Sequence, residues 1–322
     1  MLKLVILIIY FAVLIGIGLY CRKHATDVNG FVLGGRSVGP WLTAFAYGTS
    51  YFSAVVFVGY AGQFGWKYGI AATWAGIGNA IIGSLLAWVV LGRRTRIMSQ
   101  HLDSATMPQY FGKRFGSNPL KIGASVIIFI FLIPYTASLY NGLSRLFGMA
   151  FNIDYSVCII IMATLTAIYV IAGGYMATAI NDFIQGIIML FGIVAVIAAV
   201  IHSKGGFMSA LQGLANASDP AVSDTPGIFA SFFGPDPFNL LCVVILTSLG
   251  TWGLPQMVQK FYAIDNEASI QKGTVISTIF ALIVSGGCYF LGGFGRLFSD
   301  QIDVKANGFD SIIPTMLSNL SP

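Results

Sequence analysis

The sequence predicts an all-α, polytopic membrane protein with about eight transmembrane helices. Of its 322 residues, 56% are hydrophobic and 9% are charged, whereas a soluble globular domain carries about 25% charged residues. Mean hydropathy is +0.81, and the apolar residues form runs of the ~20 residues that a helix needs to cross a bilayer. The alternating pattern of a membrane β-barrel is absent from these runs. Together these features exclude a cytosolic enzyme, a disordered chain and a disulfide-stapled secreted domain.

The predicted spans follow one another along the chain with short polar connections. The first run is followed by no small-residue cleavage site, so we interpret it as a retained span and not as a signal peptide. Long apolar runs favour helices because every backbone polar group is then satisfied inside its own segment. The eight runs lie at roughly 2–20, 40–66, 69–92, 122–150, 155–177, 179–201, 238–259 and 273–298.

The distribution of Lys and Arg predicts that the N-terminus lies outside. Inner loops are enriched in basic residues, and eleven basic residues fall on one side against four on the other. The first side carries Arg22, Lys23, Arg36, Arg93, Arg94, Arg96, Lys113, Arg114, Lys121, Lys260 and Lys272, and the second carries Lys3, Lys67, Lys204 and Lys305. The net charge of +5 therefore reflects membrane orientation and predicts no nucleic-acid partner.

Two spans are interrupted at their centres by polar or helix-breaking residues. Hydroxyl residues and a glycine interrupt the second span between Thr43 and Ala54, and Gly250, Gly253 and Pro255 interrupt the seventh. Unwound backbone at membrane depth is tolerated only inside protein or beside a watery cavity. Its free carbonyls, with hydroxyls such as that of Ser50, suit a dehydrated alkali cation or a solute. The alternative is that these small residues only allow close helix packing.

Broken spans at matching places in two halves of a chain are the sequence sign of a secondary transporter site. The two interrupted spans lie five spans apart, as expected for five-helix repeats of inverted orientation. We therefore predict one membrane domain, 1–322. Its parts are a peripheral N-terminal helix (2–20), a first five-helix repeat (40–201), the first two helices of an incomplete second repeat (238–298) and an outer polar tail (299–322).

Asp182 is the one acidic residue between long apolar runs. A carboxylate at a helix centre costs about 2.5–3.5 kcal/mol on insertion scales, and a bound cation or proton would offset that cost. The alternative is a capping acid in the headgroup zone at the start of the sixth span. Aromatic residues near the breaks, such as Trp252, are candidates to cover an apolar face of a solute, although membrane aromatics more often serve packing.

Three ordered motifs resemble those of the sodium/solute symporter family, from about residue 5 to the end of the chain. Gly34-Gly-Arg-Ser37 with Phe52-Ser-Ala54 and Gly59-Tyr-Ala-Gly62 resembles its first core helix. The fifth core helix is matched by Gly173-Gly-x-x-Ala177 with Asn181-Asp182-x-x-Gln185-Gly186, and the sixth by Trp252-Gly-Leu-Pro-Gln256. Among family members, the motifs are most similar to sodium/pantothenate symporters, with sodium/proline symporters next.

The resemblance implies a distribution of roles over the two breaks. The backbone carbonyls of Thr49 and Phe52 match those that bind the main sodium ion, and Asp182 matches an acid linked to a second sodium site or the inner exit path. Substrate contacts are implied for Ser53, Pro255 and Gln256. We add Ser50 and Trp252 to the substrate-binding candidates because they lie at the breaks.

The sequence also departs from the family pattern. Tyr51 stands where proline symporters carry an essential Asp, and Val55 stands where they carry a Trp beside the substrate. The chain also stops after two helices of the second repeat, so we expect a C-terminally truncated member. The hydroxyl residues that the family places on its eighth core helix would come after Pro322.

The sequence thus predicts sodium-coupled symport of a small organic solute by alternating access. The predicted solute is a pantothenate-like carboxylate or an amino acid such as proline. The predicted location is the cell membrane, where the protein would be a multi-pass protein. We expect no enzyme activity and no cofactor beyond sodium as the coupling ion; the partners are the solute and the lipid bilayer. The alternatives are a proton-coupled transporter with Asp182 as proton carrier, a non-transporting sensor or scaffold, and, third, a membrane enzyme.

Overall fold

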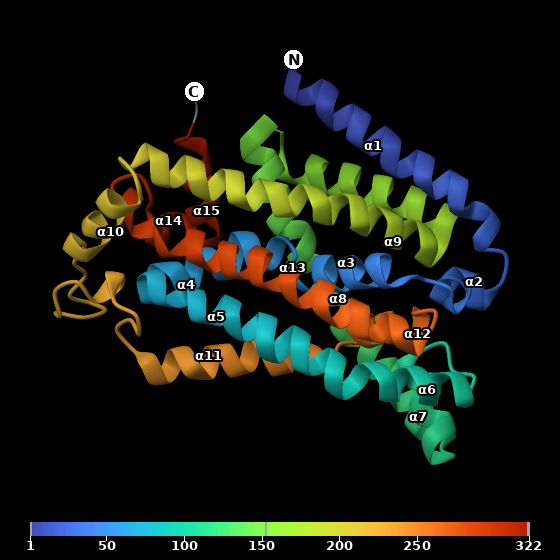
Figure 1. Ribbon diagram of the computed structural model, residues 1–322. Helices are drawn as coiled ribbons and strands as arrows, with labels where there is room; N and C mark the ends of the chain where they lie inside the picture. The colour runs from blue at the N-terminus through green and yellow to red at the C-terminus, as the bar shows by residue number, and fades with distance from the viewer. Residues whose placement is uncertain (1, 152, 321–322) are drawn as a thin grey trace.

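The structure is a computed structural model that describes residues 2–151 and 153–320. These residues form helices and connections, with only two isolated β-bridges, Val38 with Ile264 and Asp219 with Ser223. The predicted all-α fold is therefore confirmed. In Figure 1, α13 runs through the middle of the molecule, with α1 and α9 on one side of it and α5 and α11 on the other.

Helices of very different lengths make up the chain. The longer helices are α1 (Leu2–Cys21), α3 (Pro40–Tyr51), α8 (Asn118–Phe151), α9 (Tyr155–Ser203), α10 (Phe207–Asn216), α11 (Pro237–Leu249) and α13 (Glu267–Gly293). The shorter helices are α2 (Val28–Leu33), α4 (Ala61–Tyr68), α5 (Thr73–Gly78), α6 (Arg93–His101), α7 (Met107–Phe115), α12 (Pro255–Ala263), α14 (Val304–Asn307) and α15 (Ile312–Ser318). The 3₁₀ and π-helical segments are η1 (Arg22–His24), η2 (Gly34–Arg36), η3 (Val55–Tyr60), η4 (Gly69–Ala72), η5 (Asn79–Leu86), η6 (Trp88–Gly92), η7 (Ile228–Ala230), η8 (Gly250–Gly253), η9 (Gly295–Phe298) and η10 (Phe309–Ser311).

By length and composition, four helical stretches within the described residues are long and apolar enough to cross a membrane, or five with one bent pair. The four are Val55–His101, Asn118–Gly148, Tyr155–Ser203 and Glu267–Gly293, and the bent pair is Pro237–Gly253 with Pro255–Ala263. The number is lower than the eight predicted spans because Tyr155–Ser203 covers two of them, Val55–His101 covers one and part of another, and the first span is counted among the shorter apolar helices as Val5–Cys21.

The stretch from Tyr155 to Ser203 is interrupted at Gly174 and covers two predicted spans. Gly174 has φ 57° and ψ −149°, a conformation open mainly to glycine. Gly174 therefore divides α9 into two helical arms. The sequence placed this boundary at residue 178, four residues after the glycine that makes it.

Glycine lets the central helix α13 approach its neighbours at backbone distance. A Cβ on Gly65 in α4 would collide with the main chain of Gly292 in α13, and a Cβ on Gly292 would collide with the Ala61 carbonyl. Such contacts suit a bilayer, where close packing of backbones drives helix association. The contact between α4 and α13 therefore holds in place the last part of the second predicted span, which lies in α4.

We expect Gly292→Ala to destabilise the folded protein by about 1–3 kcal/mol, the usual cost of overpacking, because the new methyl group meets backbone that cannot rotate away. A control is available on the same helix, since a Cβ on Gly286 would have nothing within 4 Å. Thermal unfolding in detergent measures both variants. Equal melting temperatures for Gly292→Ala and Gly286→Ala would contradict the close approach.

The segment expected as an outer polar tail is folded against the core. Ile312, Ile313 and Met316 of α15 are fully buried. Nearby, Arg296 holds the connection between α10 and α11 in place: its Nε donates to the Trp66 carbonyl at 2.6 Å, its Nη1 pairs with Asp219 at 3.0 Å, and its guanidinium lies 3.8 Å from the Phe229 ring centroid. This end of the molecule is therefore a packed layer.

Candidate functional site

The second predicted span is broken after α3. The last hydrogen bond of α3 runs from Phe52 N to Gly48 O at 2.8 Å. Beyond the break, Val56 N and Phe57 N both donate to Ser53 O, at 3.0 and 3.1 Å. Phe52 itself has φ −98° and ψ 65°. As far as the described residues extend, these bonds leave the carbonyls of Thr49 and Phe52 without a main-chain donor.

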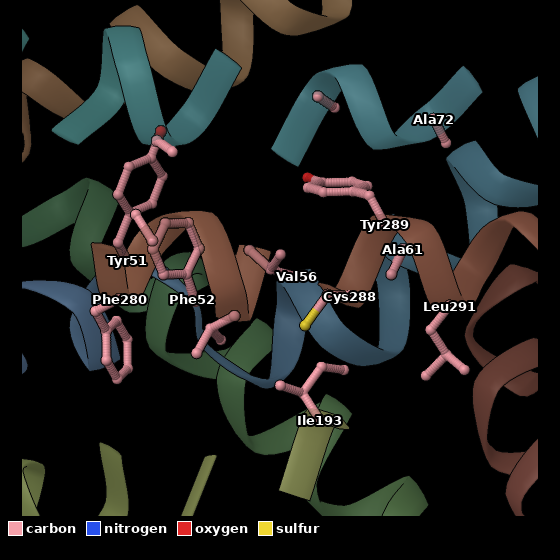
Figure 2. Close-up of a cluster of buried hydrophobic side chains, with 14 of the residues drawn as sticks. Tyr51, Phe52, Val56, Ala61, Ala72, Ile193, Phe280, Cys288, Tyr289 and Leu291 are labelled. Atoms are coloured by element: carbon pink, nitrogen blue, oxygen red, sulfur yellow. The ribbon is translucent and has the colours of Figure 1, made fainter. Parts of the chain in front are cut away.

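The side chains at this break differ in what they offer a ligand. The Thr49 hydroxyl donates to Phe45 O at 2.9 Å, so the free oxygen of this residue is its carbonyl. The Phe52 ring is buried and stacks on Tyr51 with centroids 4.4 Å apart, and the two rings lie side by side in Figure 2. Ser50 and Ser53 are half-buried. Phe52 can therefore contribute only backbone oxygen to a site.

The seventh predicted span is also broken, at the position of its glycines and proline. α11 and α12 meet at 54°, and Leu254 between them has extended backbone with ψ 127°. Pro255 starts α12, where its missing N–H costs nothing. Trp252 is fixed by its indole N–H, which donates to Ile82 O at 3.0 Å. The predicted discontinuous helices are therefore confirmed at both breaks.

Gln256 is the polar side chain best placed for a ligand at the second break. Among the described residues, neither its amide nitrogen nor its amide oxygen has a hydrogen-bond partner, although both atoms are buried. A buried amide without partners costs free energy, and a bound polar group would recover it. Asn181 on α9 has the same property.

Asp182 has a partner that the sequence did not indicate. Its Oδ2 lies 3.7 Å from Nζ of Lys260 on α12, and the two side chains are 22% and 8% exposed. The Lys260 ammonium also lies 5.0 Å from the Tyr175 ring centroid. The sequence count treated Lys260 as a loop charge, whereas the structure places it on a helix and buries it. Asp182 therefore connects α9 with α12.

The ligand set suits a monovalent cation better than a transition metal. Within residues 2–151 and 153–320, no group of three or more His, Cys, Asp or Glu residues could hold a metal ion. What the breaks present instead is neutral carbonyl and hydroxyl oxygen with a single carboxylate nearby, the donor set of hard cations.

Two arginines hold the far end of α12. Arg96 is 5% exposed; its Nε donates to Ile264 O at 2.6 Å and its Nη2 to Asp265 O at 2.8 Å. Arg36 donates to the carbonyls of Ser104 at 2.9 Å and Tyr262 at 3.4 Å. Burial lowers the pKa of Arg36, which lies in a connection outside the spans. These contacts fasten α12 to the connections on the side of the chain that is rich in basic residues.

Comparison with known proteins identifies this arrangement. The model of the sodium:solute symporter family matches residues 31–318. The osmoregulated proline transporter OpuE of Bacillus subtilis (strain 168) is 29% identical over 299 residues, which are 92% of this chain and 59% of that protein. The sodium/proline symporter of Staphylococcus aureus (strain JH9) is 28% identical over 326 residues, covering 97% of this chain and 60% of that protein. The chain thus spans about 60% of the length of these curated relatives.

A solved structure has the same fold. The substrate-bound, outward-open state of a Na⁺-coupled sialic acid symporter matches with a TM-score of 0.79 and 17% sequence identity. The match covers 100% of this chain and 66% of that one. At this level of identity the likeness concerns the fold, which is a multi-pass transporter fold with broken helices.

Proposed function

The chain belongs to the sodium:solute symporter family, and from that premise we propose that the protein couples the inward flow of sodium to the uptake of a small organic solute. The observation that carries this proposal is the break of α3, where the carbonyls of Thr49 and Phe52 lack main-chain donors. Oxygen atoms of this kind are what a dehydrated sodium ion requires. The cell membrane and an outward N-terminus belong to the same proposal.

The ion path that we propose starts at these carbonyls and passes Asp182. The contact between Phe45 of α3 and Phe183, the residue after Asp182, supports this order, because the two ring centroids lie 4.8 Å apart and join the broken helix to the segment that carries the carboxylate. Sodium at Asp182 would replace the Lys260 ammonium as the counter-charge. Lys260 therefore acts as a tethered cation that occupies the carboxylate while sodium is away.

The solute that we favour is an amino acid such as proline, with a pantothenate-like carboxylate as the alternative. The named relatives that carry proline support the first. Tyr51 and Val55 depart from the proline symporter pattern and support the second. We propose that the solute contacts Ser50, Ser53, Trp252, Pro255 and Gln256, and the unpartnered amide of Gln256 supplies both a donor and an acceptor for it.

The driving force is adequate for concentrative uptake. Moving one charge across 100 mV provides about 2.3 kcal/mol, which is a factor of tens in solute concentration.

We propose a division of the chain into four parts with different roles. Repeat 40–201 contributes the first break and segment 238–298 contributes the second. Helix 2–20 is peripheral, and 299–322 closes the outer side.

Uptake of radiolabelled L-proline into proteoliposomes tests the proposal. With an inward sodium gradient and a negative interior, we expect initial uptake at least about tenfold above that with potassium, because the ion site and the voltage both act on the cotransported charge. Labelled pantothenate is the second solute, and protein-free liposomes are the control.

Two outcomes would overturn sodium coupling. Uptake that persists in potassium and collapses when the pH gradient is removed would assign a proton as the coupling ion. Absence of sodium-dependent uptake for both solutes, in a preparation whose unfolding temperature does not respond to sodium, would favour a sensor or scaffold.

A further inference from the structure

A buried amide lies between the two helices that end at the breaks. Asn79 is the first residue of η5 and is 1% exposed. Its Oδ1 lies 3.1 Å from the Tyr51 hydroxyl, 3.0 Å from the Thr247 hydroxyl and 3.1 Å from the Ser248 hydroxyl. Its Nδ2 donates to the Ser285 hydroxyl on α13 at 3.3 Å. One side chain therefore connects four segments of the chain.

The positions of these partners relative to the breaks are specific. Tyr51 is the last residue of α3, directly before Phe52, and Thr247 and Ser248 lie in the last turn of α11, directly before η8. The single proton of the Tyr51 hydroxyl is shared between Asn79 Oδ1 and the Thr247 carbonyl, which lies 2.8 Å away. The terminal turns of both broken helices are thus bonded to the same amide and to each other.

The second break has another attachment to the same segment. Trp252 in η8 donates to the Ile82 carbonyl of η5, one turn beyond Asn79. A displacement of η5 at Asn79 would therefore move both the end of α11 and the break between α11 and α12. Asn79, Ser248 and Ser285 are buried, so the Ser248 hydroxyl, if it leaves the amide, must find another partner or remain unsatisfied.

We infer that Asn79 is a positioning residue that transmits sodium binding at the break of α3 to the break between α11 and α12. The inference rests on the proposed sodium site at the Thr49 and Phe52 carbonyls. An ion that draws the Phe52 carbonyl toward itself reorients the adjoining peptide and with it Tyr51. Because the Tyr51 hydroxyl is shared with Asn79 and Thr247, the end of α11 is ordered with it, and this order prepares Trp252 and Gln256 for the solute.

Hydrogen–deuterium exchange with sodium as the only added ligand tests this inference in the intact protein. We compare peptides covering 45–57 and 243–256 in sodium chloride and in potassium chloride. In the wild type, we expect sodium to slow exchange at least threefold in both peptides. In Asn79→Leu, we expect sodium to slow exchange in 45–57 as before and to leave 243–256 unchanged.

A matched control removes another buried hydrogen bond between η5 and α13, the two elements that Asn79 and Ser285 also connect. Ser84 in η5 and Ser277 in α13 are 2.8 Å apart, and Ser84→Ala is expected to keep the sodium response of both peptides. If Asn79→Leu does not fold, Tyr51→Phe decides, because it keeps the ring and removes the shared hydroxyl. It should likewise uncouple 243–256 from sodium.

The possible results separate this inference from the proposed function. Equal sodium protection of 243–256 in the wild type and in Asn79→Leu or Tyr51→Phe would overturn the role of Asn79 and leave sodium binding intact. A wild type in which neither peptide responds to sodium would overturn both. Loss of the response in Ser84→Ala as well would show that any weakened contact between η5 and α13 has this effect, and would overturn the assignment to Asn79.

Discussion

Replacing Asp182 with asparagine should raise the sodium concentration for half-maximal solute uptake at least about tenfold, equivalent to about 1.4 kcal/mol of ion binding. Asparagine keeps an oxygen ligand but removes the negative charge, and the attraction between unit charges 4 Å apart is about 4 kcal/mol at an effective dielectric constant of ~20. The measurement is initial uptake as a function of sodium in proteoliposomes. The solute concentration is held constant across the series.

The same substitution should also destabilise the protein in sodium-free buffer. Lys260 would then be a buried ammonium without its counter-charge, and removing one partner of a buried ion pair typically costs about 3–5 kcal/mol. Unfolding temperatures with and without sodium measure this effect. The stabilising increment that sodium gives the wild type by mass action should shrink in the variant.

Asp154→Asn is the matched control for Asp182→Asn. Asp154 lies at the start of the same helix, where its carboxylate accepts from the backbone N–H groups of Ser156 and Val157, and asparagine caps a helix about as well. The control removes one negative charge from α9 and should leave the sodium dependence alone. An unchanged sodium dependence in Asp182→Asn would exclude Asp182 from ion handling.

The sequence was most informative where local chemistry decides the structure. Gly250, Gly253 and Pro255 cannot continue a helix together, and α11 ends there with a 54° bend to α12. The isolation of Asp182 between apolar runs singled it out, because a lone acid in such a place needs a partner whatever the fold. The break after Tyr51 was predicted from its cluster of hydroxyl residues and from the family motif.

The residues that the sequence did not indicate owe their roles to tertiary contacts. Lys260 follows Gln256 by four residues and had the pattern of a loop charge, yet the 54° bend at Leu254 places it on a helix whose position brings its ammonium to Asp182. Asn79 occurs among small residues that indicate helix packing, and its partners lie 28 to 206 residues away. Neither pairing leaves a periodic signal in a single sequence.

Removing the tethered cation should act in the opposite direction from removing the carboxylate. In Lys260→Met, sodium no longer competes with an ammonium for Asp182, so we expect the half-saturating sodium concentration to fall about threefold or more. Less than half of the ~4 kcal/mol attraction between the paired charges is enough to produce a change of this size. Without sodium, the unpaired carboxylate should lower the unfolding temperature, and added sodium should recover more of it than in the wild type. Uptake and thermal unfolding are measured over the same sodium series.

The double variant Asp182→Asn with Lys260→Met completes the comparison, because a double-mutant cycle isolates the energy of the pair. With both charges gone, no buried ion lacks a partner, so stability without sodium should return toward that of the wild type while the sodium response stays weak. Lys272→Met, which removes an exposed lysine of α13, controls for the change in net charge. If Lys260→Met raised the half-saturating sodium concentration instead, the competition model would be wrong. Lys260 would then hold the Asp182 carboxylate in the geometry that sodium needs.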